Sequence, residues 1–209
     1  MLASLYELVL LFLSFKYCYK KYNPRYLKSF PVYCVINPLI ILMSFIFTSQ
    51  EGQRETLDLF MLFELTYFSY LLAQIIDRSN VTRLIWILNI GFFAAVLIFL
   101  TFHNRQGASL LIILVSPVVL VIICLIYFKI LFSEPRTVSL SKEPSFWLVT
   151  GILFHAFFTI PIFLSMLYFF YVHRSPDLGI LCFCMYSVTQ IVSYVLFTKA
   201  LICRRDLST

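Results

Sequence analysis

The chain has 209 residues, of which 61% are hydrophobic and 12% charged, and its formal net charge is +6. Soluble domains are about 45–50% apolar and about 25% charged, so this composition, with a mean hydropathy of +0.93, excludes an ordinary soluble domain. Long continuous apolar runs favour membrane-spanning helices over the alternating strands of a β-barrel. We therefore expect an all-α, polytopic membrane protein that forms a single domain over residues 1–209. Its basic balance indicates contact with an anionic lipid bilayer, and not with nucleic acid.

The apolar runs predict a bundle of seven transmembrane helices, each close to the about 20 residues that a bilayer requires. In chain order the predicted spans cover residues 2–18, 30–49, 57–77, 82–102, 108–132, 145–171 and 178–201. The first run lacks the basic leader and the small-residue cleavage site of a signal peptide, so we interpret it as a span. The loops between the runs are short, which leaves no room for a soluble domain.

Lysine and arginine residues predict the orientation of the bundle, because cytoplasmic loops carry an excess of them. Thirteen basic residues follow the first, third, fifth and seventh runs. The opposite loops hold three, Arg54, Arg105 and Arg174. This asymmetry predicts an N-terminus outside the cell and a C-terminus in the cytosol.

The six cysteines and three histidines do not follow the spacing of a metal or redox site. The cysteines include a CxC pair but no CxxC, and His103, His155 and His173 match no HxxxH or HExxH motif. Lys199 lies at the end of the last run, whereas a retinal Schiff base would require a lysine at its centre. We expect no metal, no cofactor and no enzymatic activity, since no nucleophile–base constellation is visible.

Polar residues recur at helical spacing within several predicted spans and define the candidate site. The candidates for ligand binding or proton relay are Glu7 in the first span, Glu64, Tyr67 and Gln74 in the third, His155 and Thr159 in the sixth, and Gln190 and Tyr194 in the seventh. A charged side chain that faces lipid costs about 2.5–3.5 kcal/mol on insertion scales. We therefore expect these polar stripes to face one another around a polar interior.

The two carboxylates, Glu7 and Glu64, are predicted in the outer halves of their spans, and no lysine or arginine lies deep in any span. Three interpretations remain open. The carboxyl groups are protonated, because burial disfavours the charged form. Alternatively, they pair with His155 or accept hydrogen bonds from tyrosine and glutamine. In the third interpretation they await a proton, a metal ion or an amine ligand, and only this one makes them functional.

Two classes of function fit these features. The first is a receptor-like or sensory module with a polar pocket open toward the outside, which would take a cationic or aromatic small-molecule ligand. It would signal through a partner protein, since no output domain follows Arg205. The second is a small proton-coupled transporter or channel that uses Glu64 and His155 within the membrane.

The run EPSFWLVTGILFHAFFTIPIFL, together with FELTYFSYLL in the third span and TQIVSYVLF in the seventh, carries a resemblance. It resembles a loose group of uncharacterised bacterial seven-helix membrane proteins, in which an E-P-x-F-W opening to the sixth span recurs. Some members of that group look like membrane sensor modules fused to, or encoded near, histidine kinases. The resemblance implies a sensory function, a bacterial inner-membrane location and a signalling partner, but no functional residues.

Overall fold

The computed structural model describes residues 9–16, 24–46, 50–102, 105–133, 140–169 and 176–203, and these residues contain helices and no strand. Residues 9–16 are helical. The elements that follow, in chain order, are η1 (Arg25–Ser29), α2 (Phe30–Ile46), α3 (Gln50–Ile76), α4 (Ser79–Phe102), α5 (Arg105–Ser133), η2 (Leu140–Lys142), α6 (Pro144–Leu167) and α7 (Pro176–Ile202). The predicted all-α class is confirmed.

Within the described part of the chain, five helices are long and apolar enough to cross a membrane, which makes the chain a multi-pass membrane protein. Their spans are Glu55–Ile76, Ser79–Phe102, Gly107–Ser133, Pro144–Leu167 and Ile180–Ile202. The predicted span at 30–49 corresponds to α2, whose 17 residues fall slightly short of the usual length of about 20. Of the predicted first span, residues 9–16 lie within the described part of the chain.

Helix α3 differs most from its predicted boundary, because it begins at Gln50 and not at residue 57. Its first turns read QEGQRET and are too polar to belong to an apolar run. Glutamate, glutamine and arginine are nevertheless good helix formers, and the Thr56 hydroxyl donates a 2.8 Å hydrogen bond to the carbonyl of Gly52 within this segment. The helix therefore extends beyond the apolar window that a hydropathy analysis detects.

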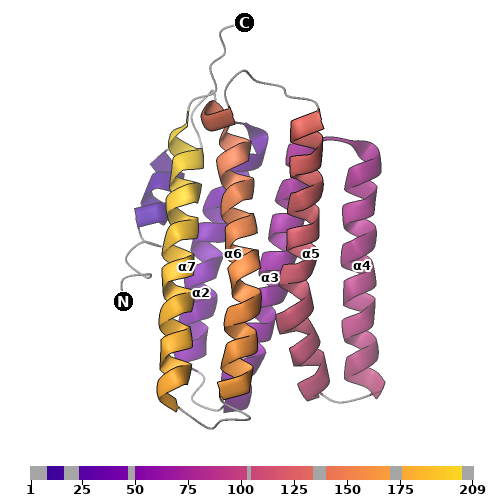
Figure 1. Cartoon of the computed structure of the whole chain (residues 1–209), viewed down its shortest axis with the longest axis vertical. Coiled ribbons are helices and arrows are strands. Elements are labelled where there is room, and N and C mark those ends of the chain that lie inside the picture. Colours follow the sequence, from indigo (N-terminus) through magenta and orange to yellow (C-terminus); the bar gives the residue numbers. More distant parts are fainter. Residues whose placement is uncertain are drawn as a thin grey trace, which may run out of the picture.

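The helices form an up-and-down bundle in which α3 is central and α4 lies at one edge (Figure 1). The apolar window of α3 is 67% buried within the protein, whereas that of α4 is 22% buried. The remaining surface of α4 carries exposed apolar side chains, including Ile87, Ile90 and Leu97. In a membrane protein such a surface faces the acyl chains, so α4 is a lipid-facing helix and α3 the helix around which the others pack.

Basic residues gather at one end of this bundle. The same end of the bundle contains the end of α3, the start of α4, the end of α5, the start of α6 and the end of α7 (Figure 1). These helix ends and their connections carry Arg78, Arg83, Lys129, Lys142 and Lys199. There the Lys199 ammonium lies 3.5 Å from the centre of the Trp147 ring, a cation–π contact that ties α7 to α6. We refer to this end as the basic end.

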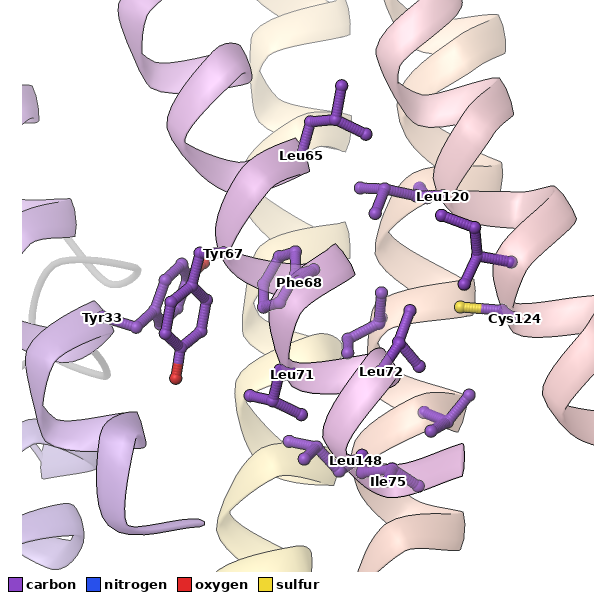
Figure 2. Close-up of a cluster of buried hydrophobic side chains, with 14 of the residues drawn as sticks. Tyr33, Leu65, Tyr67, Phe68, Leu71, Leu72, Ile75, Leu120, Cys124 and Leu148 are labelled. Atoms are coloured by element: carbon purple, nitrogen blue, oxygen red, sulfur yellow. The ribbon is translucent and has the colours of Figure 1, made fainter. Parts of the chain in front are cut away.

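A dry apolar core fills the half of the bundle that lies between the middle of α3 and the basic end. Figure 2 shows α3 side chains packed between α5 and α6. The buried core residues in this view are Leu65, Phe68, Leu71, Leu72, Ile75, Leu120, Cys124 and Leu148. On the other side of α3, the rings of Tyr33 and Tyr67 stack with their centroids 5.2 Å apart. Beyond Tyr67, the buried residues of α3 up to the basic end are therefore apolar except for Ser69.

Gly151 sets the distance between α6 and α7. A Cβ atom at this position would lie 2.6 Å from Cε1 of Phe197 and 3.2 Å from Cβ of Leu196. The Phe197 ring is 1% exposed and cannot easily move away, because the rings of Phe30 and Phe68 hold it with centroids 5.5 and 6.1 Å away.

We predict that Gly151→Ala lowers the melting temperature of the detergent-solubilised protein by several degrees, since overpacking a core costs about 1–3 kcal/mol. The matched control is Gly91→Ala in α4, where an added Cβ would meet nothing within 4 Å. This control should melt at the wild-type temperature or slightly above it, because alanine favours a helix. Equal melting temperatures for the two variants would contradict the close α6–α7 contact.

Candidate functional site

The candidate site is built around Glu64, a carboxylate near the middle of the membrane. Glu64 lies nine residues from the start (Glu55) and twelve from the end (Ile76) of the apolar window of α3. At 1.5 Å per residue these separations are about 14 and 18 Å. Its side chain is 3% exposed. An ionised carboxylate at this depth is costly unless it has partners.

Two side chains from other helices supply those partners. The Tyr33 hydroxyl of α2 donates a 2.9 Å hydrogen bond to Oε1 of Glu64. His155 of α6 places Nε2 3.2 Å from the second carboxylate oxygen, Oε2. One carboxylate thereby links α2, α3 and α6. We call Tyr33, Glu64 and His155 the Glu64 cluster.

The contact between Glu64 and His155 requires a proton. A carboxylate only accepts hydrogen bonds, and an imidazole nitrogen without hydrogen only accepts as well. The 3.2 Å separation therefore places a hydrogen on either Nε2 or Oε2. His155 is 6% exposed and is the only basic side chain that Glu64 contacts within the described ranges. The pair is thus a buried, shared proton-binding unit.

A second set of polar contacts joins α2 to α7 next to this cluster. The Asn37 amide donates a 2.9 Å hydrogen bond to the Tyr194 hydroxyl, which donates to Oε1 of Gln190 at 3.3 Å. The amide of Gln190 then donates to the Tyr186 hydroxyl at 3.0 Å. The ring of Tyr186 lies 6.1 Å from the His155 ring, centroid to centroid. The polar interior therefore extends from the Glu64 cluster to the last helix.

A small cavity adjoins the Glu64 cluster between α3, α5 and α6. It is lined by Met61, Glu64, Ser116, Pro117, Leu120, His155, Ala156 and Thr159. Its volume is about 10 Å³, counted as the space open to the centre of a water molecule. That is room for about one water molecule.

Most of the predicted site residues do face the interior. Glu64, Tyr67, His155, Thr159, Gln190 and Tyr194 are all buried, with at most 8% of any side chain exposed. Tyr67 stacks on the ring of Tyr33, and its hydroxyl lies 3.5 Å from that of Ser29. Thr159 donates a 2.7 Å hydrogen bond to the His155 carbonyl. Glu7 lies outside the described residues.

The prediction for Gln74 is wrong. Gln74 is exposed and donates a 2.6 Å hydrogen bond to the hydroxyl of Tyr70, which is 41% exposed. Ten residues of α-helix turn the chain to about 80° from its starting direction. A stripe that starts at Glu64 has therefore left the interior face by the time it reaches Gln74.

Two residues of the site, Tyr33 and Ser116, were not predicted from the sequence. Tyr33 stands one turn before Asn37, and both are buried. Ser116 directly precedes Pro117, and both line the cavity. For Tyr33, the available signal was its position one turn before the polar residue Asn37. For Ser116, it was the position next to Pro117.

Of the three interpretations of the carboxylate, the contacts agree with the second, in which Glu64 pairs with His155 and accepts from a tyrosine. The third, in which the carboxylate binds a proton or a metal ion, stays a prediction. No family model matches the chain, and neither a curated protein nor a solved structure matches it. The site is therefore interpreted from its own chemistry.

The Tyr33 contact generates a stability prediction. Tyr33→Phe keeps the ring in its stack but removes the hydrogen bond to Oε1 of Glu64. We expect a loss of about 0.5–1.7 kcal/mol in the free energy of unfolding, because single interhelical hydrogen bonds in membranes are worth about 0.6 and at most about 1.7 kcal/mol. Tyr70→Phe is the control, on an exposed tyrosine of α3 whose hydroxyl is hydrogen-bonded to Gln74 within that helix. If both variants unfold at the same denaturant concentration as the wild type, Tyr33 contributes no stabilising contact.

Proposed function

We propose that this chain is a receptor-like, sensory membrane module whose stimulus is a change in protonation of the Glu64–His155 pair. The observation that carries this proposal is the contact between a buried carboxylate and a buried imidazole, 3.2 Å apart, near the middle of the membrane. Histidine is the side chain whose ordinary change of charge falls between about pH 5 and 8. A pair of this kind can bind one proton and release it.

The size of the adjoining cavity favours a proton over an organic ligand. Pockets for small molecules measure about 300–1,000 Å³, whereas the cavity beside Glu64 measures about 10 Å³. The sensory class predicted from the sequence is retained here, but a cationic or aromatic ligand in an open pocket is not favoured. A proton needs no such pocket.

Protonation of this pair would act on the packing of three helices. When His155 is charged and Glu64 ionised, the ion pair joins α6 to α3 while Tyr33 joins α2 to the same carboxylate. Loss of the histidine proton leaves a buried negative charge without a positive partner, which is strongly unfavourable. A second packing that hydrates or protonates Glu64 would then become populated. The signal is thus a shift between two helix arrangements.

A sensory role agrees better than transport with the core around the site. Between Tyr67 and the basic end, the buried side chains of α3 are apolar, among them Leu71, Leu72 and Ile75, and Ser69 is the one buried polar residue there. A path for protons would require polar groups or water along that length. A proton-coupled transporter or channel remains the second candidate, favoured by the carboxylate–imidazole pair itself.

We further propose that the chain spans a bacterial inner membrane seven times, with the N-terminus outside and the basic end in the cytosol. The basic residues Arg78, Arg83, Lys129, Lys142 and Lys199 at one end of the bundle support this orientation. The E-P-x-F-W opening of α6 supports a relation to sensor modules. A partner protein at the basic end would receive the signal.

The proposal predicts a conformational response to pH without proton flux. In vesicles, tryptophan fluorescence of the wild type should change between about pH 5 and 8, because Trp147 reports on the α6–α7 contact. Glu64→Gln and His155→Gln should each abolish the change, whereas Glu55→Gln, at an exposed position of α3, should retain it. The same response in Glu64→Gln and wild type would refute the proposal. Proton flux that requires Glu64, measured with a dye inside the vesicles, would assign the chain to the transporter class.

A further inference from the structure

We propose that the cavity beside Glu64 binds one monovalent cation of about the size of Na⁺, and that this cation and the proton of the Glu64–His155 pair exclude each other. The inference deepens the proposed function and rests on it, because both ligands neutralise the same carboxylate. The site would then respond to two ligands, the proton and the cation, and not to the proton alone.

The charge at the site leads to this conclusion. Glu64 is buried, and within the described residues its basic partner is His155 alone. An ionised carboxylate beside a charged imidazole is neutral overall, whereas beside a neutral imidazole it leaves one uncompensated negative charge. A buried charge without a partner is strongly disfavoured, so a positive charge beside the ionised carboxylate would stabilise the present packing after the pair loses its proton. A monovalent cation in the adjoining cavity would supply that charge.

Oxygen atoms from three helices surround this position. Glu64 of α3, Ser116 of α5 and Thr159 of α6 all line the cavity. The Ser116 side chain is 2% exposed, and its hydroxyl has no hydrogen-bond partner among the residues that the structure describes. The Thr159 hydroxyl donates its hydrogen to the His155 carbonyl at 2.7 Å, which leaves its oxygen lone pairs available. Carboxylate and hydroxyl oxygens are the ligands that hard cations prefer.

Pro117 makes the neighbouring turn of α5 unusually polar. Proline has no amide hydrogen, so the carbonyl four residues earlier, at Ile113, loses its helical hydrogen bond. Pro117 also lines the cavity next to Ser116. The turn of α5 beside the cavity therefore has a carbonyl oxygen without its helical donor.

The size and charge of the site select the cation. About 10 Å³ accommodates one water molecule or a bare ion of similar radius, and it excludes organic cations such as choline. A single carboxylate matches a single positive charge. Among the described residues no group of three or more His, Cys, Asp and Glu side chains could hold a metal ion, which disfavours a divalent or transition metal.

Few other titratable groups face the pair. From α2 the pair meets Tyr33, and from α7 it meets Tyr186, whose ring centroid is 6.1 Å from that of His155. Helix α5 presents Ser116, Pro117 and Leu120. Glu64 and His155 are the only ionisable residues that line the cavity. The competition between cation and proton is therefore confined to these two side chains.

The test compares purified wild-type protein in NaCl, KCl and choline chloride at equal ionic strength, so that screening and the anion are constant. At about pH 8, where histidine is ordinarily neutral, NaCl should raise the melting temperature by several degrees relative to choline chloride, since a ligand that binds only the folded state stabilises it. At about pH 5 the difference should disappear. In weak buffer near pH 6.5, adding NaCl should release up to one proton per protein.

Ser116→Ala should weaken the apparent affinity for sodium at least tenfold while leaving the pH response of tryptophan fluorescence in place. Ser69→Ala is the matched control, because Ser69 is also a fully buried serine without a hydrogen-bond partner within the described ranges, but it does not line the cavity. If choline and sodium give equal melting temperatures at pH 8 while the pH response persists, the cation site is refuted and the proposed function stands. If the pH response itself is unchanged in Glu64→Gln, both fail.

Discussion

A buried carboxylate near the middle of the membrane, held by one tyrosine and one histidine, is the constraint on which the rest of this structure depends. Glu64 has no lysine or arginine partner within the described chain, so its burial requires both hydrogen bonds, 2.9 Å from Tyr33 and 3.2 Å from His155. Because these partners come from α2 and α6, the three helices cannot rotate independently without exposing a charge to an apolar interior. The packing of these three helices is therefore coupled to the protonation of Glu64 and His155.

The packing around the Glu64 cluster keeps it inside the bundle. Gly151 allows α6 and α7 to approach closely, and the Phe197 ring that fills the space also contacts Phe30 and Phe68. On the side of the basic end, the apolar core of α3, α5 and α6 closes the interior (Figure 2). A local polar cluster that is closed toward the basic end is better suited to shift the equilibrium between two packings than to conduct ions across the bilayer.

The sequence was sufficient to predict the helical class, the membrane environment and the inward positions of Glu64, His155, Thr159, Gln190 and Tyr194, because lipid forces polar side chains inward and helical periodicity places them. Other features depend on information that periodicity lacks. Gln74 was misplaced because a spacing of ten residues drifts by about 80°. Tyr33 and Ser116 were missed because their roles depend on which helices are neighbours and on which side chains share a cavity. The polar start of α3 was missed because a hydropathy pattern detects apolar segments and does not detect the polar part of a helix.

The central claim is that Glu64 and His155 act as one unit, and a double-mutant cycle tests it most directly. Free energies of unfolding would be measured in detergent at about pH 6 for the wild type, Glu64→Gln, His155→Gln and the double variant. Residues in direct contact show interaction energies of about 0.5–3 kcal/mol, so we expect the double variant to lose less stability than the sum of the single variants by about 1–3 kcal/mol. Effects that add within about 0.5 kcal/mol would mean that the two side chains are independent, and would contradict the account.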